Sequence, residues 1–292
     1  GGKLGGSSDA IHIIVKTGSK FTAPASDGMT RPDGNTGSYF MWLGSDGKLY
    51  APGASVPADV TALTVQWTAP TYTITLNTNG GTINSGNVTG YTYGVGATLP
   101  TAGDMTYTGH TFKGWYDNEN LTGSPVTAIG GTEMGNKEYW AKWEINQYTI
   151  TFDTAGGNVV TPITQNYGTA ITAPAAPTKT GYTFAGWDRA IPATMPAENL
   201  TITAQWTVNQ YTIAYDLAGG TAEGNPDTNT IETGAFTLKN PTKSGYTFSG
   251  WSGTGLDGEN NMTVTIPTGS TGNRTYTAHW RYNGSGHSYS YY

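Results

Sequence analysis

Paired acids are the first residues in this chain whose types and spacing could carry chemistry. The stretch LDGENN holds Asp257 and Glu259, and the stretch YDNEN holds Asp117 and Glu119. Both superficially resemble loops that bind calcium through carboxylate oxygens, but neither keeps the ligand spacing of an EF-hand loop. Since both stretches are polar turns, we expect these acids to lie in solvated loops.

Histidines and nucleophiles offer no further reactive pattern. The four histidines are His12, His110, His279 and His287. Their spacing does not match that of the ligands in a metal site. We expect His110 to be a partly buried substitute for a tyrosine and His279 to be exposed. There is no cysteine, no Gly-x-Ser-x-Gly elbow, no phosphate loop and no recurrent carboxylate pair. The sequence therefore predicts no catalytic residue, no metal site and no cofactor.

Aromatic rings offer a different chemistry, because a flat ring can stack on the face of a sugar. Most tryptophans, however, recur at equivalent places beside inward-facing partners, which indicates core packing. The residues expected in the structural core are Trp42, Trp67, Trp115, Trp143, Trp187, Trp206, Trp251, Trp280, Tyr148 and Phe184. Replacing such a tryptophan by alanine should cost roughly 3 to 5 kcal/mol.

Trp140 does not fit the core pattern. It lies three residues before Trp143, where the other copies have threonine. Strand alternation places it on the face opposite Tyr139 and Trp143. Together with Tyr116, it is the candidate for a ligand-binding aromatic residue. The alternative is that Trp140 packs against an adjoining repeat or a loop.

The elements that must position these rings belong to a repeat. The string GYTFAGW at residues 181–187 returns as GYTFSGW at 245–251 and as GHTFKGW at 109–115. An aromatic strand ending in paired glycines precedes each copy, and an alternating strand ending in tryptophan closes it. The closing tryptophans lie 63 to 76 residues apart. That spacing suits small independent domains better than the shorter units of a solenoid.

The repeats divide the chain into successive domains. We expect a flexible lead-in at 1–9, a divergent, N-terminally incomplete repeat at 10–67, repeats at 72–143, 148–206 and 211–280, and a tail at 281–292. The divergent copy lacks the opening aromatic strand, which would leave an unpaired sheet edge. The linkers have four residues and leave little room for tumbling, so we expect an elongated, semi-rigid array.

Within each copy the hydrophobic period is two, which predicts half-buried strands. The glycine pair suits a tight turn with positive φ. In GYTFAGW, alternation would turn Trp187 away from Phe184, and a β-bulge at Gly186 would return it to the core. The fold class is therefore mainly β, or α+β at most.

Composition excludes several classes of partner. The net charge is −6, and the 14 Lys and Arg residues are scattered, which argues against nucleic acid. The apolar run at residues 11–15 is far shorter than a membrane-spanning helix. The chain begins with glycine and shows no signal peptide, so we expect a fragment or a mature form.

The motifs resemble those of the Listeria/Bacteroides repeat, the family of the B-repeat of internalin-type surface proteins. The residues that carry the resemblance are YTITFDTAGG at 148–157, YGTAITAP at 167–174, GYTFAGW at 181–187 and LTITAQW at 200–206. The resemblance implies a small β-grasp-like fold on secreted or wall-attached bacterial proteins, where the repeats act as spacers or bind partners. It supplies no catalytic residue.

These observations favour a non-enzymatic, extracellular stalk or adhesin segment on the bacterial cell surface or cell wall. Its partner would be a protein or a glycan on a cell surface, with no nucleic acid and no membrane insertion in this segment. The alternative is a glycan-binding module that uses Trp140 and Tyr116. An enzyme is a third hypothesis, which a deep acidic pocket unique to one repeat would favour.

Overall fold

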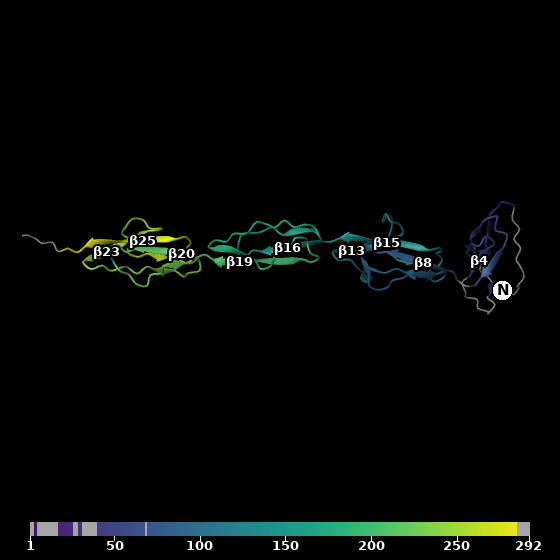
Figure 1. Ribbon diagram of the computed structural model, residues 1–292, viewed down its shortest axis with the longest axis horizontal. Coiled ribbons are helices and arrows are strands. Elements are labelled where there is room, and N and C mark those ends of the chain that lie inside the picture. The colour runs from purple at the N-terminus through teal and green to yellow at the C-terminus, as the bar shows by residue number, and fades with distance from the viewer. Residues whose placement is uncertain (1–2, 5–16, 26–28, 31–39, 68, 285–292) are drawn as a thin grey trace, which may run out of the picture. The chain divides into compact units, whose positions relative to one another are not determined.

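The computed structural model describes residues 3–4, 17–25, 29–30, 40–67 and 69–284 (Figure 1). Within these ranges the chain is mainly β, and the helical segment is the short 3₁₀ helix η1 (Ala102–Asp104). The predicted mainly-β class is confirmed, while the β-grasp detail stays a prediction. The chain divides into two compact units, Gly1–Gln147 and Tyr148–Tyr292.

The divergent first copy forms a small sheet in the order β5-β4-β7. Its strands are β2 (Phe21–Thr22), β4 (Met41–Gly44), β5 (Leu49–Tyr50), β6 (Ser55–Val56) and β7 (Leu63–Gln66), and β1 (Lys3–Leu4) pairs with β3 (Met29–Thr30). The opening strand that this copy was expected to lack would precede Phe21, where most residues lie outside the described part.

The three later copies each form a four-stranded mixed sheet. The orders are β10-β8-β15-β13, β17-β16-β19-β18 and β21-β20-β25-β23. In each, the first and last strands of the copy run parallel at the centre, and the third strand of the copy lies antiparallel at one edge. In Figure 1, β8, β13 and β15 form one group and β20, β23 and β25 another.

Corresponding strands have similar lengths in the three later copies. They are β8 (Thr71–Asn77), β10 (Gly90–Thr92), β13 (His110–Tyr116) and β15 (Lys137–Ile145); β16 (Gln147–Asp153), β17 (Ile163–Asn166), β18 (Tyr182–Trp187) and β19 (Leu200–Val208); β20 (Tyr211–Asp216), β21 (Thr228–Asn229), β23 (Tyr246–Gly253) and β25 (Arg274–Tyr282). Short pairs join β9 (Thr82–Ile83) to β12 (Met105–Thr106), β11 (Ala97–Thr98) to β14 (Ala128–Ile129), and β22 (Phe236–Thr237) to β24 (Thr265–Ile266).

A β-bulge turns the tryptophan of the GYTFAGW motif into the core, as the sequence predicts. The register shifts between Phe184 and Gly186, and the same shift occurs in the second and fourth copies. Gly186 takes a φ of 117°, a conformation that glycine adopts without steric cost. The tryptophan is deeply buried in the second and fourth copies, where Trp115 is 1% exposed and Trp251 is 0% exposed, and half-buried in the third.

The closing tryptophan packs over the second glycine of the glycine pair. A Cβ built on Gly157 would lie 2.7 Å from the Trp206 ring, and the indole Nε1 of Trp206 donates a hydrogen bond to the Thr154 carbonyl at 2.9 Å. Trp143 and Trp280 repeat both features. The glycine pair therefore makes the turn and also provides the space for the ring.

The other residues expected in the core are buried to different extents. Trp42 is buried, whereas Trp67, Trp187, Tyr148 and Phe184 are half-buried. The Phe184 ring packs edge-on against the rings of Trp187 and Trp206, with centroids 5.2 and 5.6 Å apart.

Candidate functional site

The two aromatic residues predicted to bind a ligand lie side by side in the second copy. Tyr116 on β13 pairs in register with Trp140 on β15. Tyr116 is only 7% exposed, and the Lys142 ammonium lies 5.1 Å from the centre of its ring. Trp140 is half-buried. Of the pair, Trp140 is therefore the ring that a ligand could reach.

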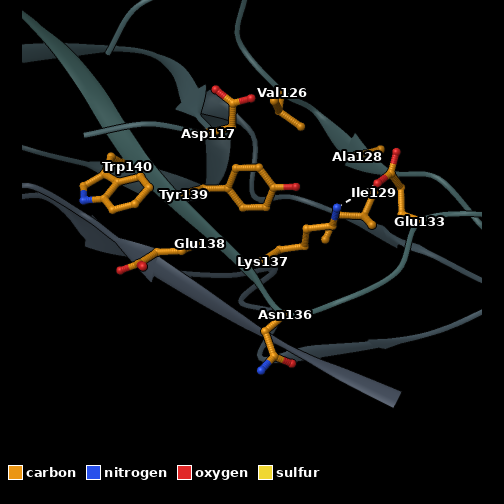
Figure 2. Close-up of a pocket in the computed structure, with 10 residues that line it drawn as sticks. All are labelled: Asp117, Val126, Ala128, Ile129, Glu133, Asn136, Lys137, Glu138, Tyr139 and Trp140. Atoms are coloured by element: carbon orange, nitrogen blue, oxygen red, sulfur yellow. Dashed lines mark hydrogen bonds and ion pairs between the residues drawn. The ribbon is translucent and has the colours of Figure 1, made fainter. Parts of the chain in front are cut away.

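A cavity of about 420 Å³ lies beside Trp140. At the cavity, β13 ends opposite Trp140, which leaves residues 137–139 of β15 without a β13 partner. In the fourth copy β23 runs one residue further, and Gly253 pairs with Tyr276, the counterpart of Tyr139. In Figure 2, Trp140 and Glu133 lie at opposite ends of the cavity, with Tyr139 and Lys137 between them.

Carboxylates dominate the charge of the cavity. Glu133, Glu138 and Asp117 line it together with a single cation, Lys137. The Lys137 ammonium lies 2.7 Å from the Glu133 carboxylate, and this hydrogen bond raises the pKa of Lys137. The other two carboxylates accept hydrogen bonds from amides: Glu138 from Asn77 at 2.9 Å and Asp117 from Asn118 at 2.9 Å. Two carboxylates of the lining thus have no cationic partner among the described residues.

Tyr139 is the polar group at the base of the cavity. Its side chain is 5% exposed, and burial raises the pKa of its phenol. Its hydroxyl makes no hydrogen bond to any residue of the described ranges, although its ring reaches into the space between Asp117 and Lys137 (Figure 2). Alternation correctly places Tyr139 on the core face, but it cannot show that the neighbouring strand ends just short of it.

A second polar cluster lies in the fourth copy. The Ser252 hydroxyl and His279 Nε2 are 2.6 Å apart, and His279 Nδ1 lies 3.7 Å from a carboxylate oxygen of Glu259. The expectation that His279 is exposed is wrong, because its side chain is 25% exposed and contacts both residues. The sequence missed the contact because Ser252 and His279 meet only through the register of β23 and β25.

Other classes of site find no support in the described residues. No group of three or more histidines and acids within them is arranged to hold a metal ion. Nor does any helix in the described ranges have the length and apolar character needed to cross a membrane.

Comparison with known proteins identifies the repeats. The family model of the Listeria-Bacteroides repeat domain matches residues 72–142, 148–205 and 211–279. A protein of Evansella cellulosilytica, provisionally named a Gly-rich membrane protein, is 30% identical over 82% of this chain and 26% of its own length. A second protein of that organism, provisionally named a membrane protein, is 32% identical over 65% of this chain and 29% of its own length.

Internalin H of Listeria monocytogenes is 34% identical over 49% of this chain and 27% of its own length. The chain thus spans less than a third of the length of each of these relatives. The family model, in contrast, matches more than half of the chain in three successive copies. The chain belongs to the Listeria-Bacteroides repeat family.

Proposed function

We propose that this chain is a non-enzymatic segment of a bacterial surface protein, which spaces or presents a binding module and contacts partners outside the cell. Family membership and the names of the relatives, an internalin and two provisional membrane proteins, support the surface location. One observation carries the spacer role: in each later repeat, hydrogen bonds hold the first residue after the closing strand.

An asparagine fixes the exit of each later repeat to its own sheet. After β19, the Asn209 amide donates to the Gly181 carbonyl at 2.9 Å, and the Asn209 side-chain oxygen accepts from the Thr183 hydroxyl at 2.6 Å. Asn146 and Asn283 make the same two contacts after β15 and β25. The residue after each of these closing strands is therefore held against its own sheet, and one residue separates β15 from β16 while two separate β19 from β20.

Small-angle scattering on the full chain tests the spacer role. A compact globule of this length has a radius of gyration of about 19 Å, so a spacer should give a clearly larger value and a long maximum dimension. Asn209→Ala should broaden the distance distribution because it removes the side-chain contact with Thr183 and so loosens the exit of the third repeat. A compact profile for the unmodified chain would overturn the proposal.

Glycan binding by the second repeat is the second candidate function. The cavity beside Trp140 favours it, because it joins an accessible indole to several hydrogen-bonding groups. A glycan array probed with the full chain and with Trp140→Thr tests this function. Threonine is the residue that the third and fourth repeats carry there, at Thr203 and Thr277. Binding that is lost in the variant supports a site at Trp140, and binding that is unchanged removes it.

A further inference from the structure

We propose that the cavity bounded by Trp140, Tyr139, Asp117 and Glu138 binds a saccharide unit that carries a free, protonated amino group. This inference rests on the glycan-binding candidate and names the class of sugar. Three features of the cavity carry it: a hydroxyl that opens into it without a partner in the described residues, an excess of carboxylates and an aromatic wall.

The first feature is the Tyr139 hydroxyl. A tyrosine hydroxyl that opens into a cavity and has no protein partner can both donate a hydrogen bond to a ligand and accept one from it. In the described part of the chain Tyr139 has none, and its side chain lines an open cavity. The equivalent Tyr276 does have a partner, because its hydroxyl oxygen accepts a hydrogen bond from the Arg274 guanidinium at 3.4 Å. A ligand hydroxyl or amine inside the cavity would give Tyr139 a partner.

The second feature is charge. The only lining cation among the described residues, Lys137, is already paired with Glu133. Asp117 and Glu138 have amide partners only, so the cavity carries a local excess of negative charge. A protonated amine would be attracted to these carboxylates, whereas uronic or sialic acids would be repelled.

The third feature is the wall formed by Trp140. Its indole lies at one end of the cavity (Figure 2), and residues such as Val126 and Ile129 add apolar surface. A sugar presents an apolar C–H face for such a wall and hydroxyl groups for the polar end. The volume of about 420 Å³ falls within the range of small-molecule sites, about 300 to 1,000 Å³.

Two residues that line the cavity have no counterpart of the same type in the third and fourth repeats. At the positions of Glu138 and Trp140, the third repeat has Thr201 and Thr203, and the fourth has Thr275 and Thr277. The wild-type residues of these repeats therefore supply substitutions that the same strand already tolerates. Glu138→Thr and Trp140→Thr should remove ligand contacts while the sheet still forms.

The test is calorimetric titration of the full chain with two matched probes, a glucosamine tetramer and its fully N-acetylated form. We expect the free-amine probe to bind at least tenfold more tightly, and high salt to weaken it. Tyr139→Phe, Glu138→Thr and Trp140→Thr should each weaken binding about tenfold or more. Tyr276→Phe, the matched change in the fourth repeat, should leave binding unchanged.

The outcomes separate this inference from the function on which it rests. Equal affinity for the two probes, with loss in Trp140→Thr, would keep glycan binding and overturn the amine preference. Binding that all three second-repeat variants retain would overturn the site. If neither probe binds and the array shows no glycan, both the inference and the glycan function fall. Circular dichroism of each variant distinguishes lost binding from lost folding.

Discussion

The turn after the first strand of each later repeat suits asparagine better than alanine, because one of its non-glycine residues has a positive φ. Three residues without the freedom of glycine hold positive φ there: Asn79 at 49°, Ala155 at 48° and Ala218 at 47°. This conformation costs an L-residue such as alanine about 1 to 2 kcal/mol, whereas asparagine tolerates it. Asn79 also donates from its side chain to the Ala141 carbonyl at 2.8 Å. The third and fourth repeats lack this contact.

Ala155→Asn should therefore stabilise the third repeat by about 1 kcal/mol, since it relieves backbone strain and can form the hydrogen bond that Asn79 makes. The measurement is hydrogen exchange of the full chain, read by mass spectrometry on peptides from residues 148–206. Asn79→Ala is the matched control and should increase exchange in the second repeat. Faster exchange in the third repeat of Ala155→Asn would contradict this explanation.

At the scale of the element, the β-bulge glycines have different surroundings in different repeats. A Cβ at Gly186 would meet nothing within 4 Å, whereas a Cβ at Gly250 would lie 2.5 Å from the backbone of Asn260. Both glycines have positive φ, 117° and 136°. Alanine would therefore strain both bulges, but of these two variants only Gly250→Ala would also force the facing loop to move.

We expect Gly186→Ala to cost the third repeat about 1 to 3 kcal/mol and Gly250→Ala to cost the fourth repeat more. Limited proteolysis of the full chain should then cut Gly250→Ala faster within residues 211–280 than it cuts Gly186→Ala within 148–206. Equal susceptibility of the two variants would show that backbone strain alone sets the cost.

The short helix η1 depends on one carboxylate. Asp104 accepts hydrogen bonds from the Thr101 amide at 2.8 Å and the Thr101 hydroxyl at 2.7 Å, and also from the Ser85 hydroxyl. These bonds, that from Ser85 first, lower the pKa of Asp104. Because the folded pKa is depressed, the stabilisation is present above the ordinary aspartate pKa of about 3.9 and is lost as pH falls through the folded value.

An NMR titration of the Thr101 amide should therefore show a midpoint below about 3.9. Ser85→Ala should raise that midpoint, since it removes the first cause of the shift. A midpoint at or above the ordinary value in the unmodified chain would show that Asp104 does not hold η1 by these bonds.

The strands could be predicted from the sequence because a half-buried strand alternates between residues that face the core and residues that face solvent. The alternation of Tyr148, Ile150 and Phe152 marks β16, and the glycine before Trp187 signals the bulge. The cavity could not be predicted this way. It depends on where β13 stops against β15 and on how the loop between them carries Asp117 and Glu133 to Tyr139, and that loop has no hydrophobic period.

At the scale of the whole molecule, what matters is whether repeats act on one another, and inside the second compact unit they do. The Tyr182 hydroxyl of the third repeat donates to Glu232 of the fourth at 2.7 Å, and this bond raises the pKa of Tyr182. Next to it, Gly181 faces Ile231, and a Cβ there would lie 2.7 Å from the Ile231 side chain. In repeat proteins, such contacts between neighbours couple the stability of one repeat to that of the next.

Gly181→Ala should therefore disturb the fourth repeat as well as its own. Gly245 is the matched control, because it holds the same place in the fourth repeat with a similar φ, 82° against 78°, and a Cβ there would meet nothing within 4 Å. We expect Gly181→Ala to speed hydrogen exchange around Thr228–Asn229 and Ile231, and Gly245→Ala to leave that segment unchanged. Equal effects of the two variants would mean that alanine acts only by straining the backbone and that the contact between Gly181 and Ile231 does not couple the repeats. The third and fourth repeats would then be independent domains joined by a linker, and the spacer would owe its stiffness to the asparagine contacts alone.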